Sequence, residues 1–143
     1  MERIEALAKH LEISLEEGEE LEDYITEDSY TENAFEAEGG NYLVLTDSEA
    51  DDAAVEYVKS SLWCFNADFL AEQTGLPEGV FKALTAQYED ANETILTLVE
   101  SHCDGGIEAF TEEAVRYDGR GHFLAQYDST ENEEGEFYIY RTN

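Results

Sequence analysis

The residue types best suited to chemistry lie near the C-terminal end of the chain. Arg120 and His122 stand in the segment Gly119-Arg120-Gly121-His122, and Arg141 lies close to the last position, in a chain with only seven Lys and Arg residues. Guanidinium groups bind phosphate and carboxylate oxygens bidentately, and histidine exchanges a proton near neutral pH. The sequence therefore allows a small anion- or nucleotide-binding pocket at Arg120, His122 and Arg141. The alternative is that both arginines form structural bridges to local carboxylates.

Two other groups of side chains suggest a metal site, but neither has the required spacing. Zinc ligation by Cys64, His102, Cys103 and His122 would need closely spaced ligand pairs, whereas His102 and Cys103 are adjacent. The acidic loop 128–135 has its glycine at the eighth position instead of the sixth, and no glutamate at the twelfth, unlike a calcium-binding EF-hand loop. We therefore expect no metal and no cofactor.

Sequence patterns typical of catalysis are also missing. The chain contains no nucleophile elbow, Walker A, zinc-protease or dinucleotide-binding pattern. Paired carboxylates are so frequent that the proximity of any two carries no information. We assign no catalytic residue and expect a protein that binds instead of one that catalyses.

Carboxylates dominate the composition. The 143 residues include 36 Asp and Glu against seven Lys and Arg, which gives a net charge of −29. A compact domain of this length is about 37 Å across, and duplex DNA of that length carries about 22 phosphates. The net charge is therefore on the scale of the DNA that such a protein would displace. It repels nucleic acid and favours a basic partner surface, with solubility and adaptation to high salt as the alternatives.

The first 40 residues have the highest density of carboxylates, with fourteen acids against Arg3 and Lys9. Leu21, Tyr24 and Ile25 would share one helical face and leave the neighbouring carboxylates in solvent. This segment, together with acids at the start of a later helix, supplies the candidate partner-binding residues. They are Glu16, Glu17, Glu19, Glu20, Glu22, Asp23, Glu27, Asp28, Asp51 and Asp52.

A small sheet and several helices must position these residues. Asn41–Thr46 is apolar and rich in strand-forming residues, and two aromatic runs, Phe123–Tyr127 and Phe137–Tyr140, flank a polar loop that Gly135 closes. Antiparallel pairing would bring Arg120 and His122 close to Arg141, because it sets the start of one strand against the end of its partner. We predict an α+β fold with a three-stranded antiparallel sheet at about 41–46, 122–127 and 136–141, packed by helices mainly on one face.

Apolar residues three and four positions apart predict the helices. A short helix covers residues 2–11. The longest begins at Ser48, which resembles a capping-box residue with Asp51, ends before Gly75, and would bury Cys64. Another helical segment covers 77–104, with a break at Asn92 as an alternative, and the last covers about 107–117.

The composition predicts a folded protein of one domain. Hydrophobic residues make up 42% and aromatic residues 12% of the chain, unlike an acidic disordered tail. We predict a single domain over residues 1–143 with an acidic N-terminal segment over residues 1–40. No apolar run approaches the roughly 18 residues of a membrane span, and the charged N-terminus does not resemble a signal peptide. Two cysteines, Cys64 and Cys103, do not form a disulfide framework, so we expect a cytoplasmic location.

A family resemblance rests on two stretches, YLVLTDSEADDAA at residues 42–54 and DGRGHFLAQYDSTENEEGEFYIYRTN at residues 118–143. They resemble a family of small acidic proteins encoded by bacteriophages, prophages and other mobile elements. The resemblance spans roughly residues 35–75 and 116–143, and it implies the cytoplasm of a bacterial host but no particular activity. In bulk properties the chain is also similar to the DNA-mimic antirestriction and anti-CRISPR proteins of phages, without a shared motif.

The sequence as a whole therefore predicts a binding protein of a mobile element. Its carboxylates would stand in for DNA phosphates on the basic surface of a host DNA- or RNA-binding defence protein and so inhibit that protein. We expect no direct nucleic-acid binding and no membrane partner. For the oligomeric state, a homodimer is an alternative to a monomer. One alternative is a small-ligand or nucleotide-binding domain, enzymatic or not, at Arg120, His122 and Arg141. Another is an acidic accessory protein whose charge serves no mimicry.

Overall fold

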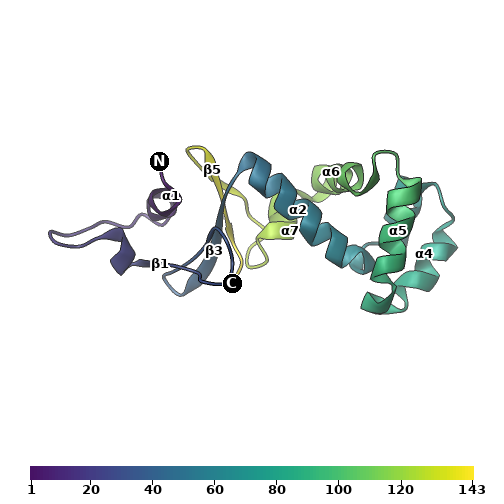
Figure 1. Cartoon of the computed structure of the whole chain (residues 1–143), viewed down its shortest axis with the longest axis horizontal. Coiled ribbons are helices and arrows are strands. Elements are labelled where there is room, and N and C mark those ends of the chain that lie inside the picture. The colour runs from purple at the N-terminus through teal and green to yellow at the C-terminus, as the bar shows by residue number, and fades with distance from the viewer. The chain divides into compact units, whose positions relative to one another are not determined.

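The protein combines seven α-helices with one antiparallel five-stranded sheet, as a computed structural model of all 143 residues shows (Figure 1). The chain divides into two units. The first contains Met1–Ala53 and Arg120–Asn143, and the second contains Ala54–Gly119. The predicted α+β class is confirmed. That the chain forms a single domain stays a prediction.

All five strands belong to the first unit. They are β1 (Ile25–Glu27), β2 (Ala34–Ala37), β3 (Gly40–Thr46), β4 (Asn132–Glu134) and β5 (Phe137–Arg141), in the order β1-β2-β3-β5-β4. β3 and β5 lie where the sequence predicts strands, and they pair antiparallel with Val44 opposite Ile139. The predicted number of three strands is wrong, because β1, β2 and β4 extend the sheet on both sides of this pair.

The segment predicted as a strand at 122–127 forms the end of a helix and a turn instead. α7 spans Arg120–Leu124, and the amide of Ala125 donates a helical hydrogen bond to the carbonyl oxygen of Gly121 at 2.8 Å. Phe123, Leu124 and Ala125 are buried one after another, whereas a half-exposed strand would alternate. A short apolar run does not distinguish helix from strand, and Leu and Ala favour the helix. β5 forms its hairpin with β4 instead.

β1 and β2 lie in the segment whose apolar residues suggested a helical face. Only a single 3-10 turn, η1 (Leu21–Asp23), is helical there, and the chain then extends through β1. The β-branched residues Ile25 and Thr26 favour the strand. In β2, exposed Glu36 lies between buried Phe35 and Ala37, which is the alternation of a strand. These strands are too short for their period to stand out in the sequence.

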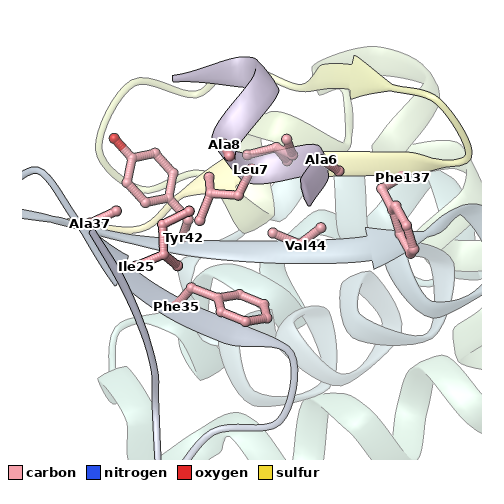
Figure 2. Packing of buried hydrophobic residues seen from close by; sticks show 10 residues of the cluster. Ala6, Leu7, Ala8, Ile25, Phe35, Ala37, Tyr42, Val44 and Phe137 are labelled. Atoms are coloured by element: carbon pink, nitrogen blue, oxygen red, sulfur yellow. The ribbon is translucent and has the colours of Figure 1, made fainter. Parts of the chain in front are cut away.

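Helices cover both faces of the sheet, and the prediction that they pack mainly on one face is wrong for this unit. On one face, α1 (Arg3–His10) contributes Leu7 to a buried cluster that includes Val44 (Figure 2). On the other face, Leu45 and Tyr140 are buried with Leu124, which ends α7. β3 is buried from both sides, which explains why its sequence is almost continuously apolar.

A capping box starts α2 (Asp47–Ser61). The amide of Thr46 donates to Glu49 Oε1 at 2.8 Å, and the amide of Glu49 donates to Thr46 Oγ1 at 3.3 Å. The predicted pair of Ser48 and Asp51 is therefore displaced by two positions, and Asp51 binds Arg120 instead. Arg3 donates from Nη1 to Glu49 Oε1 at 2.7 Å and from Nη2 to Glu49 Oε2 at 2.9 Å. This bidentate ion pair connects α1 to the start of α2.

The Arg3–Glu49 pair makes stability depend on pH. The hydrogen bond from Arg3, followed by that from the Thr46 amide, lowers the pKa of Glu49 from 4.5 to about 2. A lowered folded-state pKa stabilises the fold above pH 4.5, and this contribution is lost as pH falls toward 2. We expect Glu49→Gln to lower the free energy of unfolding at pH 7 by about 1–2 kcal/mol, discounted for solvent screening. Urea unfolding at pH 7, 4.5 and 2.5 measures the difference, and a difference that does not shrink in acid contradicts the assignment.

The second unit is entirely helical. After the end of α2 it contains η2 (Leu62–Cys64), α3 (Ala67–Thr74), α4 (Glu78–Thr85), η3 (Tyr88–Ala91), α5 (Asn92–His102) and α6 (Gly106–Asp118). α5 packs against α6, and α3 packs against α4 and α5. The alternative break at Asn92 is confirmed, because α5 begins there.

The predicted long helix from Ser48 to Gly75 is interrupted. α2 ends at Ser61, and the chain passes through η2 and an extended Phe65 before α3 begins. This break moves Cys64 off the apolar stripe, so its predicted burial is wrong and the side chain is exposed, whereas Cys103 is buried. Leu62, which begins η2, and Leu70 of α3 are both fully buried. No helix combines the length and the apolar character that crossing a membrane requires.

Candidate functional site

Charge is concentrated in the first unit. That unit carries 23 carboxylates against four Lys and Arg, a net of −19, whereas the second carries 13 against three, a net of −10. Residues 12–38 alone contribute twelve carboxylates and no Lys, Arg or His. None of these twelve takes part in a salt bridge. Residues 12–38 lie within the predicted acidic N-terminal segment 1–40, and from here on the term acidic segment means residues 12–38.

The acidic segment is ordered by hydrogen bonds that its own carboxylates accept. The amide of Glu16 donates to Glu19 Oε1 at 2.7 Å, and the hydroxyl of Tyr24 donates to the same carboxylate, which raises the pKa of Tyr24. Glu20 and Asp23 form a capping box around η1, with the Glu20 amide 2.9 Å from Asp23 Oδ2. Local carboxylate–amide bonds therefore fix the backbone that carries the remaining charges.

Asp28 organises the connection between β1 and β2. Its Oδ1 accepts hydrogen bonds from the amides of Tyr30 and Thr31, at 2.8 and 3.3 Å. The side chain of Tyr30 is 99% exposed in this turn. Tyrosine is enriched at protein–protein interfaces, so the turn presents an aromatic side chain within a carboxylate-rich surface.

Apolar side chains anchor the acidic segment to the rest of the unit. Ile25 is buried in the cluster beneath α1, and Leu11, Ile13 and Leu21 pack against that cluster with partial burial. The segment is thus attached along its length by apolar contacts, while its carboxylates lie mainly in solvent.

The ten predicted partner-binding carboxylates all lie in the first unit, in three different states. Glu19, Glu20, Asp23 and Asp28 accept or share the hydrogen bonds of the ordered backbone. Asp51 forms an ion pair with Arg120, which it shares with Asp47 and Glu131. The carboxylates of the other five take part in no hydrogen bond or salt bridge, and they are Glu16, Glu17, Glu22, Glu27 and Asp52.

The structure adds four carboxylates of the acidic segment that the predicted set omits. They are Glu12, Glu32, Glu36 and Glu38, all exposed. Their charge is visible in the sequence by counting, but the turn and strand that present Glu32 and Glu36 were not predicted. The candidate surface therefore extends from the residues after α1 to the end of β2.

A pocket of about 480 Å³ lies beside the acidic segment. Its apolar lining comes from Ile4, Ile25, Phe35 and Phe137, and its charged lining from Glu2, Arg3, Glu22 and Glu27. The Arg3 guanidinium carbon lies 5.1 Å from the centre of the Phe137 ring, and its charge is compensated by Glu49. The pocket therefore combines an apolar surface with uncompensated carboxylates.

Arg120 is bound by three carboxylates within the first unit. Its Nη1 lies 2.8 Å from Asp47 Oδ1 and 3.0 Å from Asp51 Oδ1, and its Nε lies 2.8 Å from Glu131 Oε1. Its side chain is only 10% exposed and stacks over the ring of Tyr138. An anion would have to displace these carboxylates to reach Arg120.

The surroundings of Arg120 and Tyr140 raise the pKa of both side chains. Burial alone would lower the pKa of Arg120, but the hydrogen bonds with Glu131 and Asp47 outweigh it and raise that pKa. Burial raises the pKa of Tyr140, and the hydrogen bond that its hydroxyl donates to Glu131 raises it further. The cluster therefore keeps a charged arginine and a neutral tyrosine.

No hydrogen bond, ion pair or ring contact joins Arg120 to His122 or Arg141. The Arg141 guanidinium stacks on Tyr127 at 3.8 Å, and its Nε donates to the carbonyl oxygen of Asn143 at 3.0 Å. His122 is exposed and meets its neighbour Phe123 edge-on. The assumed hairpin would have brought the three together, but α7 replaces one of its strands.

Neither a search for metal-ligand groups nor comparison with known proteins adds a residue to the candidate site. No group of three or more His, Cys, Asp and Glu side chains is arranged as metal ligands. Comparisons of the chain with protein-family models, curated proteins and solved structures find no match.

The uncompensated charge should make stability depend on salt. Repulsion among the carboxylates opposes the folded state, and the Debye length falls from about 30 Å at 0.01 M to about 10 Å at 0.1 M ionic strength. We expect the melting temperature to rise over this range in sodium chloride and equally in choline chloride. A flat or falling melting temperature would mean that the carboxylates are compensated internally. A requirement for molar salt would favour adaptation to high salt.

Proposed function

We propose that this chain is a mobile-element protein that inhibits a host nucleic-acid-binding defence protein by occupying its basic surface. The observation that carries the proposal is the acidic segment, with twelve carboxylates and no cationic side chain or salt bridge. Carboxylates at this density can replace the phosphates of a nucleic acid on a surface of Lys and Arg. The resemblance to acidic phage and prophage proteins supports the biological context.

The acidic segment has a fixed backbone, which supports a role of its charge in mimicry over a role in solubility alone. A flexible acidic tail would increase solubility as well as an ordered one, but it would lose conformational entropy on binding. Here the hydrogen bonds to Glu19, Asp23 and Asp28, together with buried Ile25, fix the backbone before a partner arrives. Preorganised charges are what a mimic of a stiff polyanion requires.

The neighbouring surface supplies contacts other than charge. The pocket that includes Ile4, Phe35 and Phe137 has space for an apolar side chain, and Tyr30 is fully available. Apolar anchors of this kind hold a complex together after charges have steered its encounter. They would also distinguish one basic partner from another, which net charge alone does not do.

The test begins with capture from a bacterial lysate on the immobilised protein, followed by elution in a sodium chloride gradient. Proteins retained above 0.3 M salt are identified, purified and tested for binding to a fluorescent DNA or RNA duplex. We expect the protein to displace the duplex from its partner competitively, with the apparent affinity for the duplex falling in proportion to the concentration of the protein.

Two results would overturn the proposal. One is a purified partner that binds the duplex with unchanged affinity while this protein is bound. The other is retention only of proteins that do not bind nucleic acid, which would favour the accessory role. A direct shift of the duplex by this protein alone is not expected, because the net charge of −29 repels it.

A further inference from the structure

A separate pocket of about 300 Å³ lies in the helical unit, between the start of α3 and the end of α6. Three aromatic residues, three carboxylates and one amide line it, and they are Phe65, Phe69, Tyr117, Asp68, Glu72, Asp118 and Asn66. No Lys, Arg or His belongs to the lining, and none of its carboxylates takes part in a salt bridge. The acidic segment belongs to the other unit, so this pocket is independent of the proposed mimicry.

The aromatic residues form two walls at a large angle. The rings of Phe65 and Phe69 stack with their centres 5.9 Å apart and their planes at 21°. The ring of Tyr117 meets Phe69 at 5.9 Å and 88°. Fully buried Phe110 contacts Phe65 and Phe69 edge-on, at 5.2 and 5.4 Å, and supports them from within the core. The walls are therefore held by packing before any ligand binds.

The electrostatics of this pocket favour a cation. Asp68 and Glu72 are four residues apart on α3, where like charges on one face of a helix repel each other. Tyr117 and Asp118 lie in the last turn of α6, where unpaired carbonyl groups add partial negative charge. The nearest cation in sequence, Arg116, is paired with Glu113 at 2.7 Å. Asp68 Oδ1 accepts a hydrogen bond from the Phe69 amide at 2.9 Å, whereas the carboxylates of Glu72 and Asp118 accept none and are available to a positive group.

We propose that this pocket binds a guanidinium group. A guanidinium stacks on an aromatic face and donates hydrogen bonds to carboxylates in its own plane, and this pocket offers both kinds of partner. A quaternary ammonium group would satisfy the rings but would give Asp68, Glu72 and Asp118 no donors. The volume is at the lower end for ligand pockets, which suits one such group and not a larger molecule. An arginine side chain of a polypeptide and a free small guanidinium compound share this chemistry.

The probes are methylguanidinium and the blocked peptide acetyl-Gly-Arg-Gly-amide, titrated into the full chain in 0.1 M sodium chloride. Aromatic NMR resonances of Phe69 and Tyr117 report binding, and the same peptide with citrulline in place of arginine is the neutral control. We expect saturable shifts with both cationic probes and none with citrulline. Tighter binding of the peptide identifies an arginine side chain as the ligand, and tighter binding of methylguanidinium identifies a free small cation.

Two exposed positions of the pocket allow variants that keep the fold. Tyr117→Leu and Glu72→Gln should each weaken the cationic probes by about 2- to 30-fold, the range that corresponds to one cation–π or charge-assisted contact. Tyr88→Leu and Glu93→Gln are the matched controls outside this pocket in the same unit, and they should leave the affinity unchanged.

Two results would overturn the assignment. Shifts that spread over the acidic residues of both units without saturating would show that the cations only condense on a negatively charged protein. Equal binding of the citrulline peptide, or equal losses in the pocket and control variants, would show that the pocket does not recognise the guanidinium charge. A failure of the mimicry test would not affect the result of the guanidinium titration, because the two tests use different probes and different residues.

Discussion

Replacing six carboxylates of the acidic segment with glutamine is expected to weaken binding to the proposed nucleic-acid-binding partner by about 2–6 kcal/mol, since each exposed charge pair contributes about 0.3–1 kcal/mol. This corresponds to a loss of affinity from tens of fold to about ten-thousandfold. The six side chains accept no hydrogen bond, so the backbone should keep its order. They are Glu16, Glu17, Glu22, Glu27, Glu32 and Glu36. Titration of the partner at several salt concentrations measures the loss, and the dependence of affinity on salt should become weaker.

A matched variant separates the surface from the net charge. It neutralises six exposed carboxylates of the helical unit, namely Glu89, Asp90, Glu93, Glu100, Glu108 and Glu112. Both variants raise the net charge by the same amount, so long-range attraction falls equally in both. If the two lose affinity to the same extent, only total charge matters and the acidic segment is not a binding surface.

The second large effect is expected at Arg120. Arg120→Met keeps most of the apolar stem but removes the hydrogen bonds to Asp47, Asp51 and Glu131. Losing a poorly exposed arginine from a network costs about 3–5 kcal/mol, and we expect about 2–4 kcal/mol here because the aspartates are well exposed and remain solvated. Urea unfolding followed by circular dichroism, with hydrogen exchange at the amides of β3 and β5, measures the loss in the first unit.

Arg116→Met is the control for this variant. Arg116 is 72% exposed and pairs with Glu113 alone, so its replacement should cost under about 1 kcal/mol. Unchanged stability of Arg120→Met, together with loss of a small-anion binding activity, would contradict the structural role and support the predicted pocket at Arg120, His122 and Arg141.

The periodicity of apolar side chains was sufficient to predict the longer helices and the two central strands. The spacing of apolar residues located α1, α5 and α6 and most of α2, because each of these helices buries one continuous stripe. β3 and β5 were also found, since burial and pairing in the centre of the sheet require β-branched and aromatic residues. Leu45 of β3, Val58 of α2 and Ile139 of β5 are buried, in keeping with these patterns.

The spacing of apolar residues did not predict the shortest helices and strands. β1 has three residues and β2 has four, and neither length distinguishes a strand from a helical turn. The sequence of the aromatic run after Gly121 is also compatible with a strand, but in the structure its first residues form α7, which packs against β5. The predicted hairpin of 122–127 with 136–141 is wrong for this reason, and the anion site at Arg120, His122 and Arg141 stays a prediction.

The sequence by itself determined the charge of this protein, its acidic segment and its α+β class, because these follow from composition and from repeating local patterns. Only the tertiary structure decided which carboxylates are free. Asp51 and Glu49 resemble Glu17 and Glu22 as residues, yet arginines distant in sequence form ion pairs with the first two and none with the others. Ion pairing depends on distances of a few ångströms between segments far apart in the chain, and only the packing of α1 and α7 on the sheet sets those distances.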